Sequence, residues 1–222
     1  MNLVIFDFCE TLVHFQTADR FVDFVLEKEQ YRKYRWINFL ARLLYRLRII
    51  VLFNKLLPKL NPMKRLKLMQ IRGIAESRID ALAKEFYQSE INPNMIATLY
   101  DLLLKHKEQK DFIIVVSGGY APYIKLFTEQ HDLNHYFATE IAFAKNKVTG
   151  FFEGKDCLFD QKVVLLNQFL KDHKLTFQKS IAYSDSFSDL PLLQWADEAF
   201  VVSRKKSQPF AKQFGFKEIV HN

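Results

Sequence analysis

The stretch VIFDFCETLV, residues 4–13, decides how this chain folds. The segment 2–6 is short, rich in β-forming residue types and free of polar alternation, which is typical of a strand buried on both faces. The strand stops at Asp7, and Cys9 and Thr11 follow at once. An aspartate at a strand end is a metal ligand, a nucleophile, or simply a turn or helix-cap residue, so the rest of the chain must decide.

Three further runs have the same character, at residues 111–117, 179–185 and 199–203. Helical apolar spacing occupies residues 94–108 and 161–173, between these strands. Alternating strands and helices predict an α/β fold, with a Rossmann-like parallel sheet covered on both faces. Ligands bind at the carboxyl ends of the strands in such sheets, so Asp7, Ser117 and Asp185 are expected to converge on one crevice.

Composition narrows the class of protein. The chain has 222 residues, of which 49% are apolar and 26% charged, enough for one large domain or a core with an insert. Cys9 and Cys157 have no metal-ligand spacing, and we expect free thiols in a reducing cytoplasm. The N-terminus lacks the charged start of a signal peptide, and no window of about 18 apolar residues predicts a membrane-spanning helix.

The region from 14 to 89 interrupts the alternation and reads as helical throughout. We therefore predict a helical cap domain at 14–89, inserted into an α/β core of residues 1–13 and 90–222. An apolar stripe at residues 40–51 has arginines beside it. Between residues 28 and 78 the chain has 14 Lys and Arg against two acids, so the insert is strongly basic.

A second acidic motif is SDSFSD, residues 184–189. Asp185 ends a strand and Asp189 lies one helical turn later, so both can face the crevice. Together with Asp7 they suit a hard divalent cation, most naturally Mg²⁺. The alternative is a helix cap followed by an exposed acid.

Two features could hold an anion. Ser117, Gly118 and Gly119 follow a buried strand and precede a helix, which brings backbone N–H groups close to a ligand, although a tight turn is the alternative. Lys162 opens the helix before the third strand and could neutralise a phosphate, although a lone lysine is usually solvated. Nearby competitors for this role are Lys145, Lys147 and Lys155.

Taken in order, these pieces resemble the four motifs of the haloacid dehalogenase-like superfamily: D-x-C-x-T at 7–11, four apolar residues and a serine at 113–117, Lys162, and D-x-x-x-D at 185–189. The insert resembles a helical cap of the C1 type. The stretches VVSGGY, KVTGFFEGKDC and YSDSFSDLPLL resemble the phosphoserine phosphatase-like branch. The resemblance covers residues 1–13 and about 90–203.

This resemblance implies a role for each residue. Asp7 would attack phosphorus and form an aspartyl-phosphate, with Lys162 cancelling the repulsion between like charges. The phosphate oxygens would be held by Thr11, Ser117, the Gly118 amide and Lys162. Mg²⁺ would be held by Asp7, the backbone carbonyl of Cys9, Asp185 and Asp189. The two acids of the last motif argue for a metal and against dehalogenation.

The sequence departs from the family at Cys9, because phosphatases of this family have an aspartate there as general acid and base. That function is typically worth about 10²- to 10⁴-fold in rate, and a thiol is a poor substitute for a carboxylic acid. Glu10 could replace it only if the loop redirects its side chain. Three outcomes follow: hydrolysis of substrates with good leaving groups, transfer of a long-lived aspartyl-phosphate to an acceptor, or binding of a phosphorylated ligand without turnover.

The basic insert bears on the substrate and partners. It favours an anionic partner: a small, sugar-linked or lipid-linked phosphate, with peripheral contact to an anionic membrane as one form of this. Nucleic-acid binding is unlikely, since no reading module is present. The charges of the insert could also simply be solvated. We therefore predict a cytoplasmic Mg²⁺-dependent phosphatase, with a weakened phospholigand-binding protein or a phosphotransferase as the alternative.

Overall fold

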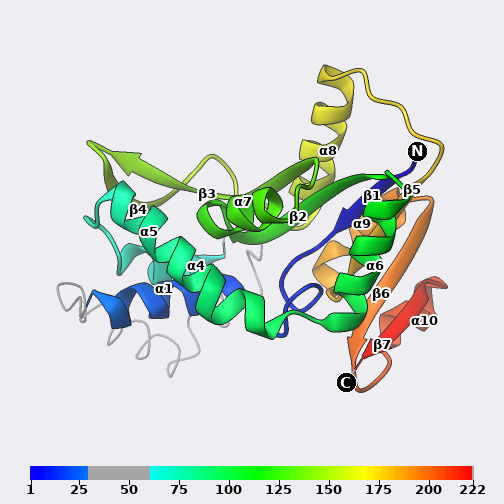
Figure 1. The fold of residues 1–222 in the computed structure, drawn as a ribbon, viewed down its shortest axis with the longest axis horizontal. Helices are drawn as coiled ribbons and strands as arrows, with labels where there is room; N and C mark the ends of the chain where they lie inside the picture. The colour runs from blue at the N-terminus through cyan, green and yellow to red at the C-terminus, as the bar shows by residue number, and fades with distance from the viewer. Residues whose placement is uncertain (30–60, 222) are drawn as a thin grey trace.

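The computed structural model describes residues 1–29 and 61–221 and has a seven-stranded sheet with the order β4-β3-β2-β1-β5-β6-β7 (Figure 1). All neighbouring strands are parallel except β3 and β4, which are antiparallel. The predicted α/β class is therefore confirmed. The strands are β1 (Leu3–Phe6), β2 (Phe112–Tyr120), β3 (His135–Ala144), β4 (Lys147–Glu153), β5 (Ser180–Ser184), β6 (Glu198–Arg204) and β7 (Lys217–His221).

The central strand β1 is buried on both faces, as its sequence predicts, and alternate side chains enter two different cores. Val4 and Phe6 belong to one apolar cluster, and Leu3 and Ile5 to the other. Because β1 pairs with β2 on one side and β5 on the other, Phe6 at the end of β1 lies in register with Val115 of β2 and Tyr183 of β5.

Each face of the sheet is covered by its own helices. On the face of Val4 lie α6 (Ala97–Glu108) and α7 (Ala121–Gln130), whose buried residues join the first cluster. On the face of Leu3 lie α8 (Asp160–Asp172), α9 (Leu190–Trp195) and α10 (Pro209–Phe214), which pack into the second cluster. Helices on both faces are the arrangement expected of a parallel sheet.

The described part of the insert is helical, as predicted. It includes α1 (Thr17–Lys28), α4 (Pro62–Met69) and α5 (Glu76–Phe86), which lie at one end of the molecule in Figure 1. Helix α4 begins where the side chain of Asn61 accepts a hydrogen bond from the Lys64 N–H and Pro62 occupies the first turn. The apolar stripe predicted at residues 40–51 lies outside the described residues. The boundaries predicted for the cap, 14–89, stay a prediction.

Several local expectations are corrected by the structure. Strand β2 runs on to Tyr120, so Ser117 and the two glycines lie inside a strand rather than in a loop after it. Helix α6 begins at Ala97, three residues after the expected start, because a single 3₁₀ turn, Asn92–Asn94, precedes it. The hairpin β3–β4 and the edge strand β7 are not predicted from the sequence at all.

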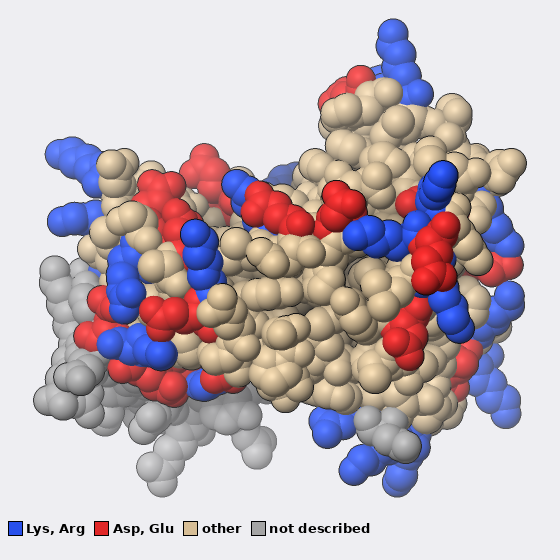
Figure 2. Space-filling view, viewed as in Figure 1, with Lys and Arg blue, Asp and Glu red and all other residues tan. Residues whose placement is uncertain are grey.

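Only some of the basic residues of the insert lie among the described residues. Eight of its 14 Lys and Arg lie between residues 30 and 60, outside the described residues. Of the others, Lys28 and Arg78 pair with acids, and so do Lys64 and Lys67. Figure 2 shows basic and acidic side chains next to one another at this end of the molecule. Contact with an anionic membrane therefore stays a prediction. No helix among the described residues is long and apolar enough to cross a membrane.

Candidate active site

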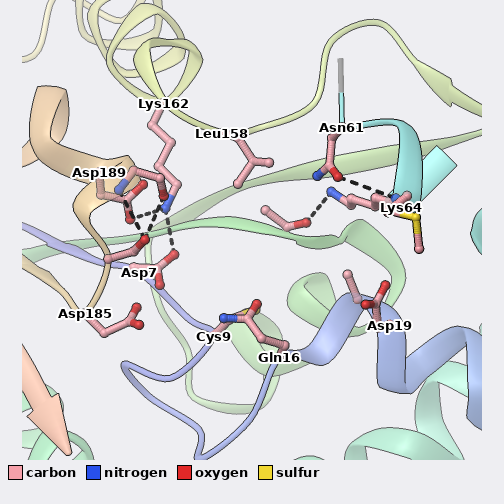
Figure 3. Close-up of a pocket in the computed structure, with 15 residues that line it drawn as sticks. Asp7, Cys9, Gln16, Asp19, Asn61, Lys64, Leu158, Lys162, Asp185 and Asp189 are labelled. Carbon is pink, nitrogen blue, oxygen red and sulfur yellow. Dashed lines mark hydrogen bonds and ion pairs between the residues drawn. The ribbon is translucent and has the colours of Figure 1, made fainter. Parts of the chain in front are cut away.

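Three chain segments meet at the ammonium group of Lys162 (Figure 3). Its Nζ lies 2.7 Å from Oδ1 of Asp7, which follows β1, and 2.6 Å from Oδ2 of Asp189, which ends the 3₁₀ turn Phe187–Asp189 after β5. All three side chains are nearly completely buried. Of the four candidate lysines, Lys162 therefore reaches the site, whereas Lys145, Lys147 and Lys155 are exposed.

The third carboxylate, Asp185, is joined to Asp7 through the hydroxyl of Thr11. This hydroxyl lies 3.3 Å from Oδ2 of Asp7 and 3.3 Å from Oδ1 of Asp185, and it accepts a hydrogen bond from the Asp185 N–H. Both carboxylates therefore contact the same hydroxyl group. Thr11 is fully buried and positions them rather than facing the cavity.

The electrostatics of this cluster are unbalanced, because three carboxylates surround one ammonium. Burial raises the pKa of Asp7 to about 6, although Lys162 lowers it. Burial and the charge of Asp7 raise the pKa of Asp185 to about 8. Burial alone would lower the pKa of Lys162, but Asp189 and Asp7 raise it well above its ordinary value. A further positive charge beside Asp7 and Asp185 would relieve this imbalance.

The residues present fit a hard divalent cation. Carboxylate oxygens are its preferred ligands, and Oδ1 of the buried Asp189 has no hydrogen-bond partner among the described residues. Within residues 1–29 and 61–221, no group of three or more His, Cys, Asp or Glu is placed so that it could hold a metal ion. The other oxygen of Asp189 accepts hydrogen bonds from Lys162 and Ser184.

Ser117 and Gly118 lie at the end of β2 nearest Asp7. Ser117 is fully buried, and its Oγ accepts a hydrogen bond of 2.9 Å from the Gly119 N–H. A side chain at position 118 would put its Cβ 2.4 Å from Cδ2 of Leu158, so Leu158 in its present position requires glycine here. Of the four residues predicted to bind phosphate, Gly118 and Lys162 line the cavity, and Thr11 and Ser117 do not.

Cys9 lines the same cavity. Its Sγ lies 3.0 Å from the hydroxyl of Thr17, the first residue of α1, and 3.9 Å from Oγ of Ser117. Burial and the charge of Asp7 raise the pKa of the Cys9 thiol to about 11, so the thiol keeps its proton at neutral pH. Cys9 and Cys157 are both free thiols, as expected. Glu10 does not replace Cys9, because it is exposed and accepts a hydrogen bond from Gln16.

The cavity has a volume of about 200 Å³ and lies between the core and the insert. The core contributes Asp7, Cys9, Gly118, Leu158, Lys162, Asp185, Ser186, Ser188 and Asp189, and the segments 16–19 and 61–64 contribute Gln16, Ala18, Asp19, Asn61, Met63 and Lys64. Such a space suits a small polar ligand or the head of a larger one.

A family model for haloacid dehalogenase-like hydrolases matches residues 4–194 of this chain. The chain belongs to the haloacid dehalogenase-like hydrolase family. The match runs from the start of β1 to the last turn of α9, and therefore includes every site residue described above.

Solved structures share the whole fold of this family member. A protein of unknown function from Bordetella pertussis Tohama I is 21% identical, with a TM-score of 0.79 over 98% of this chain and 97% of that one. A phosphoserine phosphatase in its apo form is 17% identical, with a TM-score of 0.65 over 98% and 92% of the two chains. A phospho-aspartyl intermediate analogue of phosphoserine phosphatase is 18% identical, with a TM-score of 0.64 over 99% and 93%. Comparison with proteins of curated function found no match.

Sequence reasoning missed one buried group of this hydrolase. Lys64 of α4 is only 6% exposed, and its Nζ lies 2.5 Å from Oδ1 of Asp156, 2.5 Å from the carbonyl oxygen of Gly118 and 2.8 Å from Oγ1 of Thr139. Burial lowers the pKa of Lys64, and Asp156 opposes this effect. Nothing in the sequence singles out Lys64 among the cations around it.

Proposed function

We propose that this protein is a Mg²⁺-dependent phosphomonoester hydrolase that works through an aspartyl-phosphate on Asp7. The observation that carries the proposal is the position of the Asp7 carboxylate, which lines a cavity of about 200 Å³ between the ammonium of Lys162 and the hydroxyl of Thr11. Membership of a hydrolase family supports the reaction class. The likeness in fold to an aspartyl-phosphate analogue of a phosphatase supports the intermediate.

In the first step, a carboxylate oxygen of Asp7 forms a bond to phosphorus while the bond from phosphorus to the leaving oxygen breaks, and the leaving oxygen keeps the electron pair and takes a proton from water. Lys162 lies against Asp7 and offsets the repulsion between its carboxylate and the phosphate. Ser117 and the Gly118 amide donate hydrogen bonds to the phosphate oxygens. In the second step, water attacks phosphorus, orthophosphate leaves, and the Asp7 carboxylate is restored.

Asp7, Asp185 and the backbone carbonyl of Cys9 would hold the Mg²⁺, with Asp189 as a ligand or as a hydrogen-bond partner beside it. The bound cation supplies positive charge that stabilises the transferring phosphoryl group. The excess of carboxylates over ammonium groups, and the unpartnered Oδ1 of Asp189, support this assignment.

Cys9 determines which substrates are turned over quickly. A buried thiol can donate a hydrogen bond to the leaving oxygen, but it is a weaker acid than a carboxyl group. Esters with good leaving groups, such as aryl or acyl phosphates, need little help from an acid and should react fastest. The natural substrate is a small phosphomonoester or the phosphorylated head of a sugar or lipid that fits the cavity.

The same residue favours a second candidate function. A protonated thiol is not a base, so the attack of water on the aspartyl-phosphate lacks assistance. The intermediate would then live longer and could be passed to an acceptor hydroxyl. This candidate predicts that added alcohols, such as glycerol, divert phosphate from water and accelerate turnover.

Phosphate release from an aryl phosphate, measured with MgCl₂ and again with excess EDTA, tests the proposal. We expect release that EDTA and Asp7→Asn abolish, and that Asp101→Asn, at an exposed position of α6, leaves unchanged. A wild-type protein that releases no phosphate from aryl, acyl or sugar phosphates, yet binds them stoichiometrically, would instead be a phospholigand-binding protein.

A further inference from the structure

Lys64 is a buried cation that the proposed reaction does not use. It comes from α4 in the insert, yet its ammonium contacts three groups of the core: the Gly118 carbonyl on β2, the Thr139 hydroxyl on β3 and the Asp156 carboxylate. An ammonium has three hydrogens, and three acceptors surround this one. Lys64 therefore has no remaining donor for a ligand, although it lines the cavity.

The contact with Gly118 leads directly to Ser117. The Gly118 carbonyl belongs to the same peptide group as the Gly119 N–H, and this N–H donates a hydrogen bond of 2.9 Å to Oγ of Ser117. Hydrogen bonds in a chain polarise one another, so an ammonium at the carbonyl makes the N–H a stronger donor. The hydrogen bonds all point the same way, from the ammonium of Lys64 through the Gly118–Gly119 peptide group to the hydroxyl of Ser117.

The same series of hydrogen bonds determines whether the hydroxyl of Ser117 can donate to a ligand. Its oxygen already accepts from Gly119, so its hydrogen is free to be donated. The nearest other partner is Sγ of Cys9 at 3.9 Å, a long contact even for sulfur. Ser117 itself does not line the cavity, but Cys9 beside it does. A phosphate oxygen that takes the place of this long thiol contact is a much better acceptor, so the hydroxyl is free to donate to it.

We propose that Lys64 is a positioning residue for the phosphate group: from α4 it fixes and polarises the Gly118–Gly119 peptide, so that Ser117 and Gly118 present their donors to the phosphate. The inference rests on the proposed function, in which these two residues hold phosphate. It follows that phosphate affinity depends on α4 being seated against the core, although no residue of α4 donates to the phosphate.

The alternative is that Lys64 only stabilises the fold through its ion pair with Asp156. Lys64→Met alone would leave a carboxylate buried without its partner, which destabilises proteins strongly. The double variant Lys64→Met/Asp156→Asn removes both charges and avoids this. Lys67→Met is the matched control, because Lys67 lies on the same helix but pairs with Asp23 at the surface.

The readout is the binding of inorganic phosphate in the presence of Mg²⁺, measured by calorimetry on variants whose thermal unfolding shows that they are folded. We expect binding roughly 3- to 10-fold weaker in the double variant, since one charge-assisted hydrogen bond acts through a peptide group. Asp156→Asn alone keeps Lys64 on Gly118 and is expected to bind phosphate within about twofold of wild type. Lys67→Met should match wild type.

A folded double variant that binds phosphate as tightly as wild type overturns the proposal, and so does an equal loss in Lys67→Met. A wild-type protein that binds phosphate but hydrolyses no ester contradicts the proposed function. The role of Lys64 is then still decided by the phosphate affinity of the double variant. A wild-type protein that binds no phosphate overturns both. Should the double variant not fold, the Gly119 amide resonance of the intact protein decides: phosphate should shift it, and an unchanged resonance at saturation overturns the proposal.

Discussion

The ammonium of Lys162 lies 2.7 Å from Oδ1 of Asp7, although 155 residues separate the two in the chain. The same ammonium lies 2.6 Å from Asp189, so one cation holds two buried carboxylates in place. The attraction lowers the cost of a charged Asp7 in a site that is otherwise unfavourable to it. In the proposed reaction, this attraction keeps the Asp7 carboxylate available as the nucleophile beside the phosphate.

Lys162→Met should therefore slow phosphate release by about 10²-fold or more, because Asp7 and the phosphate then repel each other without compensation. It should also lower the free energy of unfolding, since two carboxylates stay buried without their cation. Initial rates and urea unfolding measure the two effects. Lys171→Met, at an exposed position of the same helix, should change neither. Unchanged rates in Lys162→Met would remove Lys162 from the mechanism.

Replacing Cys9 with the acid that the family has at this position should increase activity. Cys9→Asp is expected to raise phosphate release from alkyl phosphates by about 10²-fold, and less from aryl phosphates, because poor leaving groups need the proton most. Cys9→Ala is the matched control for size and should be no faster than wild type. Equal rates for Cys9→Asp and Cys9→Ala on an alkyl phosphate would show that position 9 takes no part in proton transfer.

The core of the fold and the cluster around Asp7 could be predicted from the sequence, for a physical reason. Strands β1, β2 and β5 are continuous apolar runs, so each is recognisable by itself. The polar residue that ends each run is then brought to the same sheet edge by parallel pairing. Asp7 and Asp185 are brought together in this way. Lys162 opens α8 and does not end a strand, so its place at the site is expected only from the resemblance to the family motifs.

The parts that were missed depend on pairing rather than on local pattern. Strand β3, His135–Ala144, has a mixed burial pattern and an irregular register with β2, so its sequence shows no clean period. The extension of β2 to Tyr120 is stabilised by its pairing with Thr139, which no local signal reveals. Lys64 looks like one more surface cation, because its burial depends on Asp156, distant in the sequence.

The close packing of Leu158 on Gly118 gives a test of the phosphate-binding backbone. Gly118→Ala should destabilise the fold by about 1–3 kcal/mol and weaken phosphate binding, because the new Cβ would lie 2.4 Å from Cδ2 of Leu158. Leu158→Ala makes room, so the double variant should lose less stability than the two single variants together. Urea unfolding of the three variants forms the cycle. Strict additivity would show that the two residues do not contact each other.

A buried network away from the cavity predicts how stability depends on pH. Asp111 accepts hydrogen bonds from the Asn2 N–H at 2.8 Å and from the His106 ring at 3.0 Å, and His106 also contacts the Tyr183 hydroxyl. Burial alone would raise the pKa of Asp111, but the hydrogen bonds from Asn2 and His106 lower it below the ordinary value for an aspartate. An acid whose pKa is lower in the folded state stabilises the fold above its unfolded pKa, and this stabilisation is lost as pH falls through the folded pKa.

Asp111→Asn should accordingly lower the free energy of unfolding at pH 7 by about 1–3 kcal/mol, the range for a buried hydrogen-bonded group. The difference from wild type should stay constant down to about pH 4 and shrink below it, as the wild-type carboxyl group becomes protonated. Urea unfolding between pH 3 and pH 7 measures it, with Glu108→Gln at the exposed end of α6 as the control. A difference that grows toward acid pH would contradict the assignment, because it would mean that the folded state raises the pKa of Asp111.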